Sequence, residues 1–172
     1  KEISYSDNSF RFGFSKLVES NEFFFQLSKG FRPPQINELF RLQKSQTLAN
    51  LNSEKIDSIE FGILSEGKNF NNKFVLFSSK KNNYIYKDDD ASTISDGKSK
   101  HQGIEVSGLV KIKPDLSINY AWSFARHLYD YSFSEIGVVK GNYIDTAPKI
   151  YGSLFLNITT VKNLTLQIEE EY

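Results

Sequence analysis

The chain has 172 residues, a length typical of one domain, and no apolar run approaches the ~18 residues of a membrane-spanning helix. Its 21 basic and 21 acidic residues give a formal net charge of zero, and the basic residues are scattered, so the charge pattern does not favour nucleic-acid binding. The sequence contains no cysteine, which excludes disulfide scaffolds, thiolate metal sites and cysteine nucleophiles.

Alternation of apolar and polar residues is the dominant pattern along the chain. It begins at Phe10, Phe12 and Phe14, and it is clearest from Leu116 to Ala125. Because successive side chains of a β-strand point to opposite faces, each such segment has one apolar and one polar face. We therefore predict an all-β fold, an antiparallel meander of about eight long strands. The expected strands are residues 9–18, 22–30, 56–68, 73–87, 99–112, 116–129, 149–159 and 164–172.

The connections between these strands alternate in length. Short polar turns are expected at residues 19–21, 69–72, 113–115 and 160–163, and long polar links at residues 31–55, 88–98 and 131–148. In a meander, the turns then share one end of the sheet and the links share the other. This arrangement of long amphipathic strands is typical of an outer-membrane β-barrel. Aromatic residues expected near strand ends, as in an interfacial girdle, are Tyr84, Tyr86, Trp122, Tyr129 and Tyr131.

The first long link contains a proline pair followed by a helical pattern. Pro33 and Pro34 cannot donate to a β-ladder, so strand pairing should stop there. Pro34 suits the first turn of a helix. We expect a short helix near the barrel mouth, whose apolar face packs down through Ile36, Leu39, Phe40 and Gln43.

The segments "KGFRPPQINELFRLQ" and "LNSEKIDSIEFGI" together resemble the motifs of a known protein family. They look like the barrel of TonB-dependent outer-membrane receptors, in which a strand ending in Gly-Phe-Arg-x-Pro precedes a Glu-Leu pair and a Glu-Lys segment. The later "HQGIEVSG" resembles another strand of that family. The matching positions are Gly30, Phe31, Arg32, Pro34, Glu38, Leu39, Glu54, Lys55, Glu60, Gly62, Gly103, Ile104 and Glu105.

The resemblance implies active transport across the bacterial outer membrane. A receptor of this family has a barrel of roughly 22 strands that encloses a plug domain. It implies TonB-dependent uptake of a scarce ligand such as a ferric siderophore, with membrane lipid, the plug, TonB and the small-molecule ligand as partners. The sequence contains neither plug nor TonB-contacting segment. We therefore interpret residues 1–172 as a partial β-barrel domain, an internal fragment that forms a curved open sheet.

Five residues at the outer strand ends, or in the loops above them, are candidates for ligand contact. Arginine can bind catecholate, hydroxamate or carboxylate oxygens bidentately, and tyrosine can stack on a ligand. The competing interpretation for each residue is ordinary loop anchoring, such as hydrogen bonds from an arginine to loop carbonyls. The candidates are Arg32, Gln35, Arg126, His127 and Tyr129.

Other chemical sites find little support in the sequence. His101 and His127 could share a metal on facing strands, but no third ligand has suitable spacing, so we interpret both as polar residues of the barrel interior. Asp88–Asp90 and Asp96 lack the spacing of a calcium loop and are interpreted as solvated. No catalytic triad, phosphate-binding glycine loop or paired carboxylates stand out. We expect no metal site, no cofactor and no enzymatic activity.

Three other architectures compete with the receptor wall. A complete eight-stranded barrel with a structural or adhesive role would fill its interior with side chains, whereas the polar face here is rich in small residues such as Ser117, Ala121 and Ser123. We predict that strand 9–18 does not pair with strand 164–172. A soluble lectin-like sandwich would need a second sheet, and a β-propeller would place four short strands in each period of roughly 45 residues.

Overall fold

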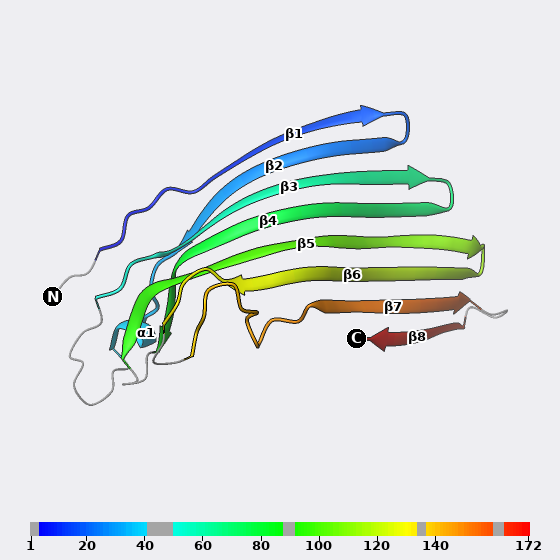
Figure 1. The fold of residues 1–172 in the computed structure, drawn as a ribbon. Helices are drawn as coiled ribbons and strands as arrows, with labels where there is room; N and C mark the ends of the chain where they lie inside the picture. Colours follow the sequence, from blue (N-terminus) through cyan, green and yellow to red (C-terminus); the bar gives the residue numbers. More distant parts are fainter. Residues whose placement is uncertain (1–3, 41–49, 88–91, 134–136, 160–163) are drawn as a thin grey trace.

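The computed structural model describes residues 4–40, 50–87, 92–133, 137–159 and 164–172. The strands of these residues form a single curved sheet (Figure 1). Eight antiparallel strands follow one another in the order β1 to β8, so each strand pairs with its neighbours in the sequence. One short helix, α1 (Ile36–Phe40), lies between β2 and β3. The strands are β1 (Phe10–Val18), β2 (Asn21–Arg32), β3 (Glu54–Gly67), β4 (Phe70–Lys87), β5 (Thr93–Lys113), β6 (Leu116–Tyr129), β7 (Ile150–Thr159) and β8 (Thr165–Glu171).

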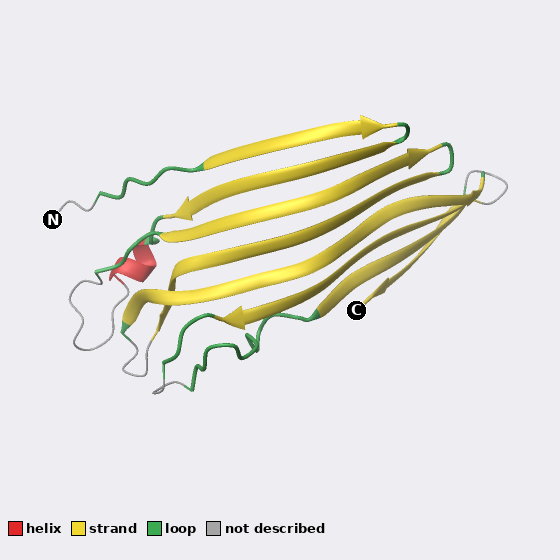
Figure 2. Cartoon of the chain, turned by 45° about the horizontal axis from the view of Figure 1, so that its top comes forward, coloured by secondary structure: helices red, strands yellow, loops and turns green. Residues whose placement is uncertain are grey.

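The sheet is open, with β1 at one edge and β8 at the other (Figure 2). The prediction that the first and last strands do not pair is confirmed, and the alternative of a closed eight-stranded barrel is wrong for this chain. The single layer also excludes the sandwich. The tight turns gather at one end of the sheet, whereas α1 and the long connections gather at the other (Figure 1). We call the second end the loop end.

Strand β5 is longer than predicted, because residues 93–98 continue the ladder instead of forming a link. Tyr84 pairs with Gly97 and Tyr86 with Ile94, after bulges that interrupt the register. Asn83 adopts a left-handed backbone with φ of 58° at this interruption. The added segment buries Thr93, Ser95 and Gly97 on alternate positions, and this pattern lacks the apolar signal on which the strand prediction depended.

The register gathers most of the apolar side chains of the strands on one face of the sheet, which we call the apolar face. One row of directly opposed residues on it is Phe14, Phe25, Phe61, Leu76, Ile104 and Phe124. An equivalent row on the other side, the polar face, is Arg11, Ser28, Ser58, Ser79, His101 and His127. Phe14 is 62% exposed and Phe61 43%. A face of this kind needs lipid or another apolar partner to cover it.

The buried apolar cluster of the described residues lies at the loop end. Leu39 of α1 packs with Leu51 and Ile85, and Tyr5 covers this small cluster. The expectation that Ile36 and Phe40 also pack down is wrong, since they are 79% and 58% exposed. A helix of five residues presents too short an apolar stripe, and Gln43 lies outside the described residues. No described helix is long and apolar enough to cross a membrane.

Gly62 provides a test of the strand register. It lies directly opposite Phe24, and a Cβ atom built on it would collide with the Phe24 ring and approach the Phe74 carbonyl oxygen at 2.8 Å. Gly62→Val is therefore expected to displace that ring and to cost about 1–3 kcal/mol of folding free energy. Denaturant unfolding of the full-length protein in lipid vesicles measures the cost. Gly13→Val is the control, because a Cβ there has only ordinary contact with the Phe25 carbonyl oxygen at 3.8 Å. Equal costs for both variants would contradict the register.

Candidate functional site

The loop end of the polar face carries a network of charged side chains around Arg32, the last residue of β2. Arg32 Nε donates to Glu54 Oε2 at 2.8 Å, and its Nη1 and Nη2 donate to the two carboxylate oxygens of Glu38 at 2.9 and 3.0 Å. Lys81 Nζ lies 3.0 Å from the same Glu54 oxygen. The network therefore joins β2, β3, β4 and α1.

Glu54 is the buried centre of this network, with a side chain only 6% exposed. Its Oε1 accepts a hydrogen bond of 3.0 Å from the Ile85 N–H. Burial opposes ionisation, but hydrogen bonds from Arg32, Ile85 and Lys81 outweigh it and lower the pKa of Glu54 to about 2. In turn, the hydrogen bonds to Glu54 and then to Glu38 raise the pKa of Arg32 above its ordinary value.

The network explains the positions of two predicted site residues. Arg32 is held at the end of β2 by hydrogen bonds to the carboxylates of Glu38 and Glu54. The Gln35 N–H donates to Glu38 Oε2 at 2.6 Å, and the residue is exposed at the start of α1. Both residues therefore lie together, at the loop end above the polar face.

His127 lies directly opposite His101 on the polar face. Their Nδ1 atoms are 2.8 Å apart, so one imidazole donates its proton to the other, and His101 Nε2 is 2.8 Å from Ser99 Oγ. The described residues contain no group of three or more His, Cys, Asp or Glu side chains that could hold a metal ion. The pair thus forms a polar hydrogen-bonded unit that links β5 to β6.

Five aromatic rings form a cluster beside this pair, which we call the tyrosine cluster: Tyr84, Tyr86, Tyr129, Tyr131 and Phe133. Ring centroids are 6.2 Å apart for Tyr84 and Tyr86, 5.6 Å for Tyr86 and Tyr131, and 5.9 Å for Tyr129 and Tyr131. Phe133 meets Tyr86 edge to face at 6.2 Å. Burial raises the pKa of Tyr131, so its hydroxyl stays protonated at neutral pH.

The expectation of an interfacial girdle is therefore wrong for Tyr129, because it lies opposite Ser99 and alternates onto the polar face with His127. Trp122 does lie on the apolar face, but in the middle of β6 and not near a strand end. Asp96 belongs to β5 and accepts a hydrogen bond of 2.8 Å from the Tyr86 hydroxyl. Asp88–Asp90 lie outside the described residues.

Arg126 is separated from the other candidates by the sheet itself. It lies opposite Gln102 and in the same alternation as Phe124, so it is exposed on the apolar face. Two polar-face residues that matter at the site, Glu54 and Lys81, are not among the five ligand candidates. Lys81 Nζ also lies 4.6 Å from the centroid of the Tyr84 ring. Strand alternation from Ser79 would have assigned Lys81 to this face.

Comparisons with known proteins agree with the architecture. The β-barrel family model described as "TonB dependent receptor-like, beta-barrel" matches residues 2–165. A comparison with curated protein sequences finds no match. Among solved structures, the siderophore receptor PirA from Pseudomonas aeruginosa is similar with a TM-score of 0.72 and 16% identity, over 95% of this chain and 30% of that one.

Two further solved receptors are similar in the same way. The ferric yersiniabactin uptake receptor FyuA from Yersinia pestis has a TM-score of 0.70 and 15% identity, over 95% of this chain and 24% of its own. The ferric-catecholate import receptor Fiu from E. coli K12 has a TM-score of 0.68 and 16% identity, over 94% and 24%. The chain thus spans less than a third of the length of these receptors. Since the family model matches nearly all of the sequence, the chain belongs to the TonB-dependent receptor-like β-barrel family.

Proposed function

We propose that residues 1–172 form part of the barrel wall of a bacterial outer-membrane receptor that takes up a scarce ligand, such as a ferric siderophore, with energy delivered through TonB. Family membership supports this proposal. So do two similar solved structures, a ferric-catecholate import receptor and a ferric yersiniabactin uptake receptor. The partners proposed are the membrane lipid, a plug domain, TonB and an iron chelate. The family consists of transport receptors, and no enzymatic step is proposed.

The tyrosine cluster is the observation that supports ligand capture most directly. It presents aromatic faces at the loop end of the polar face, beside the cation of Lys81 and the imidazole of His127. Aromatic rings stack on planar ligand groups, and a cation attracts the negative charge of an iron chelate. Arg32 and Gln35 complete the proposed contact surface at its edge. Arg126 is left out of it, because it lies on the opposite face.

A paired substitution tests this surface in the full-length receptor. Tyr129→Ala with Tyr131→Ala removes two rings that meet at 5.9 Å, and we expect the Kd of a ferric catecholate to rise about tenfold, since each aromatic contact contributes ~0.5–1.5 kcal/mol. Equilibrium binding to the purified receptor measures the change. Tyr151→Ala is the control, because Tyr151 lies on the same face opposite Ser123, away from the cluster.

Two outcomes would contradict the proposal. Equal affinity of the double variant and the wild type for the ferric catecholate would show that the tyrosine cluster is not part of the ligand surface. Uptake of radioactive iron that continues unchanged in cells lacking TonB would exclude energised transport, whatever the binding result.

A further inference from the structure

The apolar face ends toward the loops in a band of basic side chains, which we call the basic band: Lys29, Lys80, Lys100 and Arg126. Lys29, Lys80 and Lys100 belong to one row of directly opposed residues, with Asp57 between the first two. Arg126 follows on β6, opposite Gln102. Four cationic side chains and one carboxylate therefore lie in a band across this face, next to the apolar rows on the side of the loop end.

The arrangement of Lys80 and Lys100 is electrostatically unfavourable without a partner. They are directly opposed on one face, and like charges in that position destabilise a sheet. Lys100 Nζ lies 2.8 Å from Asp130 Oδ1, and Asp57 Oδ1 lies 4.0 Å from Lys29 Nζ. Within the described ranges, neither Lys80 nor Arg126 has a carboxylate oxygen within 4.0 Å. An anion bound over this row would relieve the repulsion.

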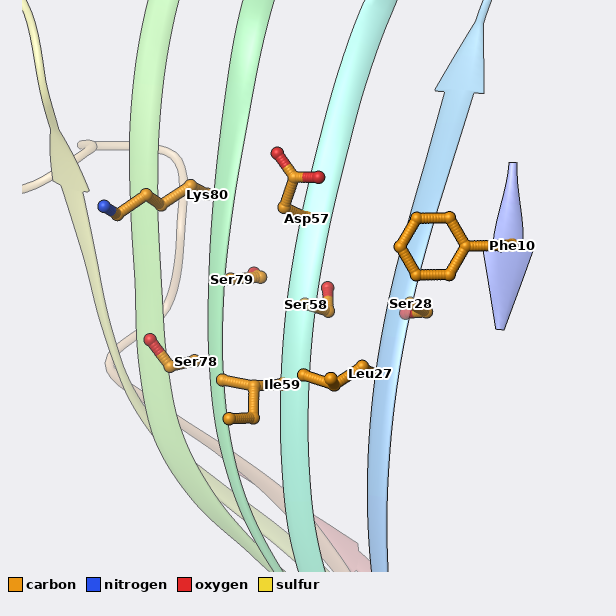
Figure 3. A pocket seen from close by; sticks show the side chains of 9 residues that line it. All are labelled: Phe10, Leu27, Ser28, Asp57, Ser58, Ile59, Ser78, Ser79 and Lys80. Carbon is orange, nitrogen blue, oxygen red and sulfur yellow. The ribbon is translucent and has the colours of Figure 1, made fainter. Parts of the chain in front are cut away.

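A groove of about 330 Å³ opens on the same face beside Lys80 (Figure 3). Its polar part, toward the loop end, has Asp57 and Lys80 on neighbouring strands. Its apolar part has Leu27 and Ile59, with the Phe10 ring at the side (Figure 3). The charged part of the groove thus lies nearer the loop end than the apolar part. This order matches a lipid whose headgroup lies nearer the loop end than its acyl chain.

We propose that the basic band binds the phosphate groups of lipid in the outer leaflet, with Lys80 and Arg126 as the main contacts and the groove holding an acyl chain. The charge of the band is complementary to phosphate. Its continuity with the apolar face favours a lipid over a soluble anion. The proposal depends on the family's membrane location and is independent of which ligand the receptor takes up.

The test uses the purified full-length receptor and lipid A as the probe, with and without its phosphate groups. In native mass spectrometry titrations, we expect the wild type to retain the phosphorylated lipid preferentially. Lys80→Ala with Arg126→Ala should raise the Kd for that lipid roughly 30-fold, since each basic side chain near a membrane surface contributes ~1 kcal/mol. Lys73→Ala is the control, because Lys73 lies on the polar face opposite Leu64. Lys80→Arg should retain the lipid.

Three results would overturn the proposal. Equal retention of phosphorylated and dephosphorylated lipid would show that the charges play no part. An equal loss in the Lys73→Ala variant would point to net charge and not to the basic band. Displacement of the lipid by equimolar inorganic phosphate would assign the site to a soluble anion. Migration of the unheated double variant as a folded barrel in electrophoresis establishes that it has folded.

Discussion

Glu54→Gln in the full-length receptor is expected to loosen the loop end at neutral pH and to remove a pH dependence that the wild type shows in acid. The pKa of Glu54 is lowered from 4.5 to about 2 in the folded protein. Since one pKa unit corresponds to 1.36 kcal/mol, the ionised carboxylate contributes about 3 kcal/mol to the local free energy of opening. Because the folded pKa is the lower one, this stabilisation is complete above pH 4.5 and is lost as the pH falls toward 2.

Hydrogen exchange at the Ile85 amide measures this effect directly, because that N–H donates to Glu54 Oε1. Its protection should fall in wild type as the pH is lowered from 4.5 to 2, after correction for intrinsic exchange, and should be low throughout in the variant. Glu60→Gln is the matched control, since it removes a carboxylate from the same strand and the same face. If the Ile85 amide of the variant keeps wild-type protection at neutral pH, Glu54 is not the centre of the network.

Phe61→Arg is expected to cost about 2–4 kcal/mol of folding free energy in lipid vesicles, because it places a charge on the lipid-facing side of a barrel strand. Phe61 lies near the middle of β3, directly opposed to Phe25 and Leu76 on the apolar face. Denaturant titration of the reconstituted full-length receptor measures the cost, and the fraction of heat-modifiable barrel in cells should fall with it.

The neighbouring residue supplies the control for this prediction. Glu60→Arg introduces the same side chain one position earlier, on the polar face opposite Gln26 and Phe77. It should be tolerated, because an interior or plug-facing position is hydrated. If Glu60→Arg proves as costly as Phe61→Arg, the assignment of the two faces is incorrect, and the proposed lipid contacts of Lys80 and Arg126 fail with it.

The face on which a loop-end side chain lies follows from the alternation of its own strand. Alternation alone assigns Phe124 and Arg126 to one face and His127 to the other. Residue type and nearness to the loop nevertheless group Arg126 with His127 as ligand candidates, whereas the strand period separates them. That correction was available from the sequence itself.

Other features depended on contacts between strands. The meeting of Arg32, Glu54 and Lys81 requires the register of β2, β3 and β4, which the turn lengths and pairing determine together. The length of β5 depends on residues 93–98, where Gly97 pairs with Tyr84 and Ile94 pairs with Tyr86 across two register shifts. No local hydrophobic pattern marks such a segment as strand.

The sequence by itself determined the all-β meander, the end at which the long loops gather, and the two chemically distinct faces. Each of these follows from a period-two pattern or a turn, which are local properties of the chain. Only the tertiary structure decided that the tyrosines cluster on the polar face and that Lys80 opposes Lys100. The physical reason is that contacts between strands depend on register and curvature, which arise from all eight strands together and from no single one.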